Sequence, residues 1–182
     1  FSRNPVTAEI EDFEDILVNI QGREVSGADL QFDWRFAAGP GEVGVNALVS
    51  WMDTYKTLPP PGLPAAESAG LVGGLIGASF PEWKSNLQLR YQWEALAFGT
   101  QWRFIDSMRD SDPELNYPIA SQNYFDLFAS YAIDEGVLDG LTVRAGVENV
   151  TNEDPPLLPS AVQANTDPSQ YDVLGRRYYM NV

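Results

Sequence analysis

Hydrophobic and polar residues alternate along most of this chain. In the segment 86–94, the apolar residues Leu87, Leu89, Tyr91 and Trp93 alternate with polar ones. A period of two over this length predicts a β-strand with one apolar face and one polar face. The pattern predicts about eight strands and no amphipathic helix. The other segments that alternate are 30–36, 43–51, 98–104, 125–133 and 141–147, with a weaker candidate at 13–20 and a last strand at 175–182.

From the second predicted strand onward, the connections alternate in length, whereas the first connection, at 21–23, is short where the pattern predicts a long loop. A tight hairpin is predicted around Leu96. Short turns at one end of a sheet and long loops at the other are typical of transmembrane β-barrels. The short connections are 37–42, 96–97 and 134–140, and the long ones, rich in Pro, Asp and Asn, are 57–81, 107–121 and 151–171.

Large aromatic residues gather near the ends of the predicted strands. We expect Trp34, Trp51, Trp83, Trp93 and Tyr131 to form aromatic belts at the two interfaces of a membrane. The polar faces carry Arg, Gln, Asn, Asp and Glu, which suits the watery interior of a barrel. A soluble β-sandwich or barrel turns its apolar face inward and also explains the alternation. The alternation by itself therefore leaves a membrane barrel and a soluble domain open.

Charge and composition narrow the classes of function. The chain has 26 acidic and 11 basic residues, and its net charge of −15 excludes a nucleic-acid partner, because phosphate binding requires clustered Lys and Arg. It contains neither Cys nor His, which excludes thiolate zinc sites, cysteine nucleophiles and histidine bases. The acidic loops match no calcium-binding motif, and no pair of carboxylates stands out as catalytic. We therefore expect a protein that is not an enzyme, without catalytic residues, metal or cofactor.

Several stretches share a recognisable pattern. The most specific part combines Gly-Val-Glu-Asn and Asp-Pro-Pro with the later Gly-Arg-Arg-Tyr-Tyr. Together the stretches resemble the closing strands and the last loop of TonB-dependent receptors. The stretches are Gly27–Leu30, Phe80–Lys84, Asn123–Tyr131, Gly140–Asn149, Asn152–Pro156, Asn165–Pro168 and Tyr171–Tyr179.

The resemblance implies an antiparallel transmembrane β-barrel of about 22 strands with a plugged lumen. Residues 1–182 are then expected to be the C-terminal segment of one barrel domain, with the N-terminal barrel strands and the plug domain outside this chain. The implied function is energy-coupled uptake of a siderophore or another bulky nutrient across the outer membrane of a Gram-negative bacterium. The implied partners are the lipid bilayer, a TonB-type energy transducer that contacts the absent N-terminal part, and a small-molecule substrate.

Candidate contact residues follow from the expected loops. Because binding residues favour loops, Tyr55, Arg109, Tyr117 and Tyr124 are the predicted loop contacts for a substrate. The tyrosines of the predicted terminal strand are linked by the resemblance to barrel assembly. Arginines on the polar faces either pair with carboxylates or form a cationic wall for an anionic substrate. The terminal tyrosines are Tyr178 and Tyr179, and the polar-face arginines are Arg90, Arg103 and Arg144.

Two other interpretations of the function stay open at this point. The first is a small, complete outer-membrane barrel with a structural or adhesive role, since eight strands can close a narrow barrel. The second is a soluble β-barrel module that binds a small ligand or a sugar, with the apolar side chains of the segment 86–94 inside.

Overall fold

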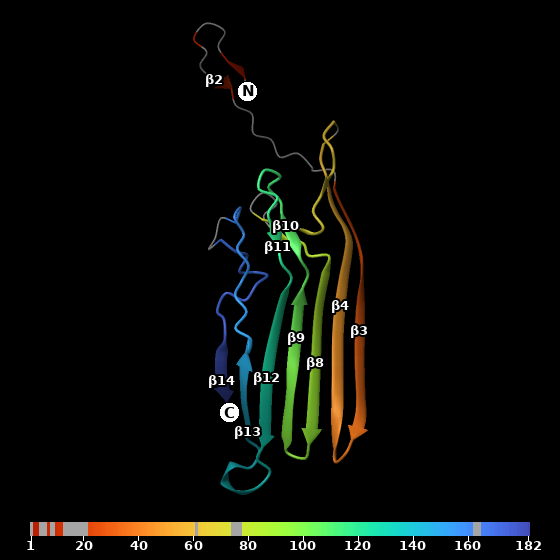
Figure 1. Ribbon diagram of the computed structural model, residues 1–182, viewed down its shortest axis with the longest axis vertical. Coiled ribbons are helices and arrows are strands. Elements are labelled where there is room, and N and C mark those ends of the chain that lie inside the picture. Colours follow the sequence, from red (N-terminus) through yellow and green to blue (C-terminus); the bar gives the residue numbers. More distant parts are fainter. Residues whose placement is uncertain are drawn as a thin grey trace.

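Long antiparallel strands form a single wall (Figure 1). The computed structural model describes residues 2–3, 7, 10–12, 22–60, 62–73, 78–161 and 165–182. The order of the long strands across the sheet is β3–β4–β8–β9–β12–β13–β14, and the predicted all-β antiparallel architecture is confirmed. Their bounds are β3 (Gly22–Ala38), β4 (Gly41–Leu58), β8 (Trp83–Trp93), β9 (Leu96–Ile105), β12 (Gln122–Ala132), β13 (Thr142–Glu148) and β14 (Arg177–Asn181).

The other described elements are short. β1 (Ser2–Arg3) pairs with β2 (Ile10–Asp12), and β5 (Ala66–Glu67) adds to the edge of β4. A 3-10 helix, η1 (Gly136–Leu138), lies in the turn between β12 and β13. Within the described ranges, no helix is long and apolar enough to cross a membrane.

The strands near the start of the sheet are longer than their alternation predicted. β3 has 17 residues and β4 has 18, and the turn between them contains Gly39, whose φ of 61° favours glycine. The tight hairpin predicted around Leu96 is present, but its two turn residues are Glu94 and Ala95 rather than residues 96–97, because Leu96 already pairs with Trp93. The weaker strand predicted over 13–20 lies outside the described residues.

The two faces of the wall differ in chemistry. Cross-strand partners project from the same face, as Trp34, Val45 and Leu89 do in three neighbouring strands. From the short turns up to the level of Trp51, this face carries no charged side chain in the described strands. Apolar side chains as large as Phe32 are about half exposed there, and water makes such exposure unfavourable by about 25 cal/mol per Å². This apolar face is therefore typical of a barrel wall that borders lipid.

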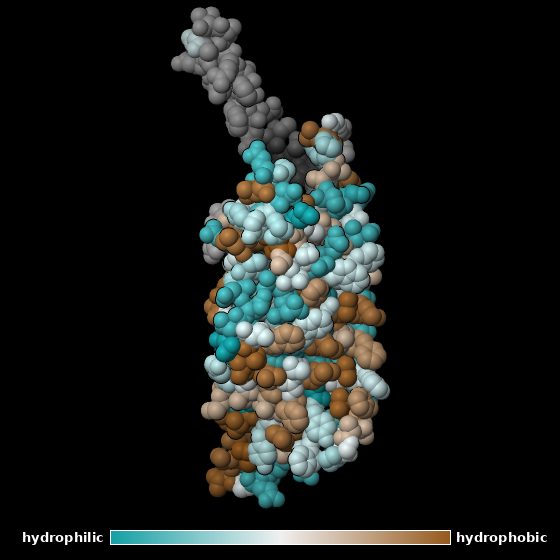
Figure 2. Space-filling view, in the orientation of Figure 1, coloured by the Kyte–Doolittle hydropathy of each residue, from teal (hydrophilic) through white to brown (hydrophobic). Residues whose placement is uncertain are grey.

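Hydrophobic and hydrophilic side chains are also divided along the length of the molecule. Figure 2 shows hydrophobic side chains gathered over the long strands, whereas hydrophilic ones gather toward the end with the long connections. Apolar side chains are thus concentrated over the strands, as in a barrel whose loops stand in water.

Two of the long connections, predicted as loops, contribute strands to a second sheet. β6 (Leu71–Gly73), β7 (Ala78–Ser79), β10 (Met108–Asp110) and β11 (Pro118–Ile119) form a four-stranded sheet in which β10 runs parallel to β6. We call this sheet, together with residues 151–161 and 165–172, the cap. Burying one large apolar side chain stabilises a fold by roughly 1.5–3 kcal/mol. The core formed by the described residues lies between the cap and the wall, and contains Val72, Ile105, Met108, Ile119, Tyr124, Leu158 and Tyr171.

Candidate functional site

The face of the wall opposite the apolar face is polar. One cross-strand row on this polar face contains Asp33, Asn46, Gln88, Gln101 and Asp126 in five neighbouring strands. The amide of Asn46 donates a hydrogen bond to the carboxylate of Asp33. Amide and carboxylate groups need water or hydrogen-bond partners, so this face suits a water-filled interior.

A β-bulge turns Tyr55 onto the polar face. The register of β3 and β4 shifts next to Gly27, and beyond the shift Tyr55 lies opposite Val25. Arg23 Nη1 donates a hydrogen bond of 2.8 Å to Tyr55 Oη, and the Tyr55 ring stacks on Phe80 with ring centroids 4.0 Å apart. Tyr55 therefore belongs to a strand, and its prediction as a loop residue is wrong.

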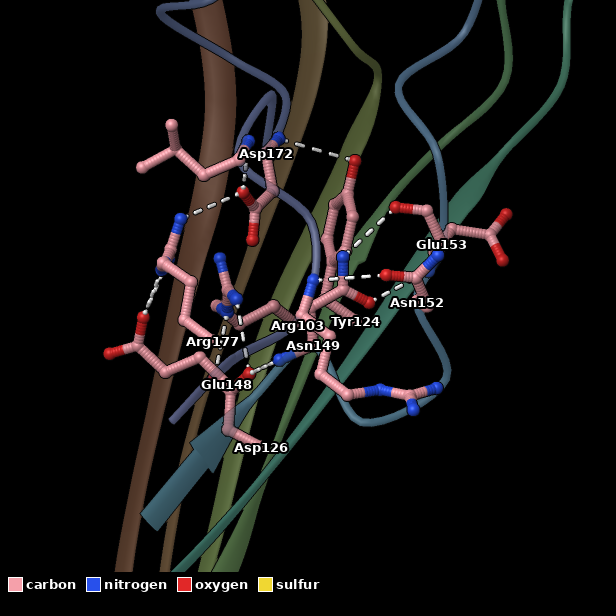
Figure 3. A network of polar contacts seen from close by, with 11 residues as sticks. Arg103, Tyr124, Asp126, Glu148, Asn149, Asn152, Glu153, Asp172 and Arg177 are labelled. Carbon is pink, nitrogen blue, oxygen red and sulfur yellow. Dashed lines mark hydrogen bonds and ion pairs between the residues drawn. The ribbon is translucent and has the colours of Figure 1, made fainter. Parts of the chain in front are cut away.

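Arg103 on β9 and Asp126 on β12 form a bidentate ion pair on the polar face (Figure 3). Arg103 Nε and Nη2 each lie 3.2 Å from an oxygen of Asp126. The same carboxylate accepts the backbone N–H of Asn149 at 2.8 Å, and the Arg103 guanidinium lies 5.1 Å from the ring centroid of Tyr124. Asp126 therefore joins the wall to the first residue of the last long connection.

Asn149 closes a tight turn at that point. It is fully buried, its Nδ2 donates to the carbonyl of Glu153 at 2.9 Å, and its Oδ1 accepts the N–H of Glu153 at 2.8 Å. Asn149 and Asn152 have φ angles of 50° and 56°, in a region that Asn adopts more readily than most residues. Asn152 Oδ1 accepts the N–H of Arg176 at 3.1 Å, which links the two ends of the connection.

Arg177 on β14 holds two carboxylates at once. Its Nε and Nη2 donate to Glu148 Oε2 at 2.9 Å and 2.6 Å, and its Nη1 donates to Asp172 Oδ1 at 3.1 Å. The backbone N–H of Asp172 in turn donates to Tyr124 Oη at 3.4 Å. The network in Figure 3 thus ties the final strand, its neighbour β13 and the cap to one another.

Replacing Asp126 with asparagine should release the last connection while the wall stays assembled. The change removes the charge that pairs with Arg103 and weakens the acceptor of the Asn149 N–H, at an expected cost of about 1.5–3 kcal/mol. Limited proteolysis of the folded protein should then cut residues 151–172 faster. Asp33→Asn, a change in the same row without contact to the cap, is the matched control. Equal protection of the two variants would contradict this role for Asp126.

Two cavities lie where the cap meets the polar face. One, of about 390 Å³, is lined by Lys84, Arg103, Tyr124 and Gln170 among others. The second, of about 400 Å³, is also lined by Lys84 and Gln170, and it extends along β3 from Val25 to Asp29. Lys84 Nζ donates to Gln170 Oε1 at 3.4 Å. The lining offers cationic, anionic and amide groups, which can bind a solute rich in oxygen and nitrogen.

The carboxylate of Asp167 holds two segments of the cap together by accepting hydrogen bonds from hydroxyl groups. Burial alone would raise the pKa of its carboxyl, but hydrogen bonds from Ser169 and Ser79 outweigh burial and hold the pKa below its ordinary value of 3.8. Because the pKa is lower in the folded protein, ionised Asp167 stabilises the cap above pH 3.8, and this contribution is lost as the pH falls through the folded-state pKa.

A pH profile tests this anchor. We expect the protection of residues 165–172 from an acid-active protease to fall on acidification below pH 3.8 in the native protein. Asp167→Asn should show weaker protection whose pH dependence is flatter, because the group that titrates is gone. Identical profiles for the two proteins would show that Asp167 does not anchor the cap.

The remaining predicted contacts lie in or beside the cap. Arg109 lies in the short strand β10, so its prediction as a loop residue is also wrong, and its Nη1 donates to Asn116 Oδ1 at 3.4 Å. Tyr117, which is 42% exposed, lies in the loop between β10 and β11. Tyr124 lies in β12 and is 1% exposed, so its prediction as a loop residue is wrong. Its ring packs in the core under the cap, and the residue borders the first cavity.

The five aromatics predicted for the belts all lie on the apolar face. Trp51 and Trp83 are cross-strand partners whose rings stack with centroids 5.9 Å apart, at the end near the cap. Trp93 and Tyr131 lie beside the short turns, and Trp34 lies between these two levels. Contact of these rings with membrane interfaces stays a prediction.

The terminal strand contributes to both faces. Tyr178, opposite Val147, projects from the apolar face, whereas Tyr179, opposite Gly146, projects from the polar face. Their predicted role in assembly remains a prediction.

Sequence reasoning missed the residues that fasten the cap. Asn149, Gln170 and Asp172 lie between the end of β13 and the start of β14, where no periodicity indicates position. The Asn149–Asn152 pair directly after a strand was a usable signal, because Asn favours such turns. The pairing of Arg103 with a carboxylate was one of two predicted roles, and it is confirmed. No group of three or more His, Cys, Asp or Glu side chains in the described ranges could hold a metal ion.

Comparison with known proteins agrees with this architecture. The family model described as "TonB dependent receptor-like, beta-barrel" matches residues 2–150. No curated protein matches the chain. The family match covers most of the 182 residues, including the paired strands β3, β4, β8, β9, β12 and β13. The chain therefore belongs to the TonB-dependent receptor-like β-barrel family.

Proposed function

We propose that this chain forms part of the wall of a transporter in the outer membrane of a Gram-negative bacterium, and that the whole protein imports a siderophore or another bulky nutrient. The observation that carries the proposal is the division of the sheet, from the short turns up to the level of Trp51, into an uncharged face and a polar face. In the proposal the uncharged face borders lipid and the polar face borders the lumen. Membership of the receptor family supports the same orientation.

The cap is proposed to capture the solute. Arg109 and Tyr117 are accessible on its surface, whereas Tyr55 and Tyr124 lie where the cap meets the polar face. A solute that enters the cavities beside Lys84 meets groups that can replace its bound water. No bond is made or broken in this step, and energy enters through a TonB-type transducer that acts on the rest of the protein.

Uptake by cells with and without the full-length protein tests the proposal. The probes are a radiolabelled ferric hydroxamate, a ferric catecholate, cobalamin and an oligosaccharide. We expect one probe to accumulate only when the protein is present, and to stop accumulating when the inner-membrane proton gradient is collapsed. Uptake that is the same without the protein, or that survives loss of the gradient, would contradict an energy-coupled importer.

A further inference from the structure

One cross-strand row on the polar face alternates glycine with large side chains. A glycine between two long side chains leaves a notch in the surface of a sheet, because nothing extends beyond its backbone. The row therefore contains a series of notches along the wall. From β3 to β14 it reads Arg35, Gly44, Arg90, Gly99, Phe128, Gly146 and Tyr179.

Aromatic rings already fill two of these notches. A Cβ added to Gly99 would lie 2.6 Å from Cζ of Phe128, and one added to Gly146 would lie 2.6 Å from Cζ of Tyr179. Each ring therefore covers the glycine that is its cross-strand partner. A ring over a strand glycine restores the packing that the missing side chain would provide.

The notch at Gly44 is open. The nearest atom to a Cβ added there is the carbonyl oxygen of Arg90, 4.0 Å away. A cavity of about 390 Å³ lies at this position, lined by Arg35, Asn46, Gln88 and Arg90 among others. The space that a ring occupies at the other two glycines is therefore empty here.

The two arginines beside the notch have no ion pair. Among the described residues, no carboxylate oxygen lies within 4.0 Å of the guanidinium of Arg35 or Arg90. Two carboxylates also line the cavity, and their charges offset those of the arginines: Asp33, which accepts a hydrogen bond from Asn46, and Glu42. A lining with balanced charge favours a neutral guest over an anion.

We propose that the notch at Gly44 is a binding site for a neutral aromatic ring, held between the guanidinium groups of Arg35 and Arg90. Two strand spacings of about 4.8 Å separate the backbones of these arginines by about 10 Å. Both arginines line the cavity at Gly44. A ring in this cavity is therefore flanked by two guanidinium groups, which attract the face of a ring over roughly 6 Å.

The ring belongs either to a polypeptide segment inside the barrel or to a solute. This proposal rests on the proposed function in one respect: it assumes that the polar face lines the lumen of the barrel.

Ring-current shifts test the proposal in the full-length protein. The protein is labelled with ¹⁵N-arginine and reconstituted in lipid, and the Nε–H signals of the two arginines are identified by their loss in Arg35→Lys and Arg90→Lys. We expect both signals to lie upfield of their positions in Gly44→Leu, whose side chain fills the notch. An upfield position without any additive assigns the ring to the polypeptide. An upfield shift that appears only with added p-cresol assigns the ring to a solute.

Two further variants make the result decisive. Ser50→Leu, on the same strand and face outside this cavity, should leave the two arginine signals unshifted. Gly44→Ala narrows the notch where space is open, and repeats the test should Gly44→Leu fail to fold. Signals that coincide in the native protein and in both Gly44 variants, with and without p-cresol, would overturn the site. That outcome leaves the uptake assay unaffected, so failure of the site and failure of the proposed function are distinguishable.

Discussion

Arginine in place of Leu89 should prevent most of the protein from assembling in the membrane. Leu89 projects from the apolar face, between Val45 on one side and Thr100 on the other, and is 39% exposed. An arginine that faces lipid near the membrane midplane costs about 2–4 kcal/mol. Net stabilities of folded proteins are only about 5–15 kcal/mol, so this is a large share. The folded fraction of the full-length protein in membranes can be measured from its change in gel mobility on heating.

The neighbouring residue provides the control. Gln88 is adjacent in sequence but projects from the polar face, where it lines a cavity. Gln88→Arg should therefore assemble nearly as well as the native protein. Normal assembly of Leu89→Arg, or equal failure of both variants, would show that the two faces are wrongly assigned.

Alanine in place of Gly99 should destabilise the wall by about 1–3 kcal/mol, the usual range for overpacking. The added Cβ would lie 2.2 Å from the carbonyl oxygen of Leu89 and 2.6 Å from Cζ of Phe128. The ring can move aside, but the carbonyl oxygen belongs to a paired strand, so the ladder itself must shift. Denaturant unfolding of the full-length protein in lipid vesicles measures the change in the free energy of unfolding.

Alanine in place of Gly44 tests whether crowding causes the loss of stability expected for Gly99→Ala. Gly44 lies in the same row, yet a Cβ there meets only one atom, at 4.0 Å. Gly44→Ala should therefore change the free energy of unfolding by less than about 0.5 kcal/mol. A Phe128→Ala change added to Gly99→Ala should recover only part of the loss, because the clash with Leu89 remains. Equal losses at the two glycines would point to backbone entropy rather than crowding.

The wall could be predicted from the sequence because, apart from the bulge in the β3–β4 pair, its strands alternate regularly between the two faces. Each face of such a strand meets a single environment. A period of two in hydropathy therefore predicts both that a segment is a strand and which side chains share a face. Leu87, Leu89, Tyr91 and Trp93 all lie on the apolar face as their alternation indicates. The family match supports the membrane interpretation over the soluble one.

The cap could not be predicted because its strands are too short to show a period. β6 and β10 have three residues each, and they pair in parallel across a long stretch of sequence. The position of Tyr55 was missed for a related reason. One extra residue in the strand reverses the alternation beyond it, and hydropathy alone does not reveal where a bulge occurs.

If the apolar face borders lipid as proposed, the placement of the core between cap and wall gives the molecule two separate sources of stability, one in water and one in the bilayer. Most of the buried apolar residues that the structure describes gather under the cap, whereas the long strands leave their apolar side chains for the surrounding medium to cover. A change in bilayer thickness should therefore alter the wall and leave the cap nearly unchanged. Hydrogen exchange should show the reverse when a mild aqueous denaturant is added: amides of the cap open first, while those of β4 and β8 stay protected.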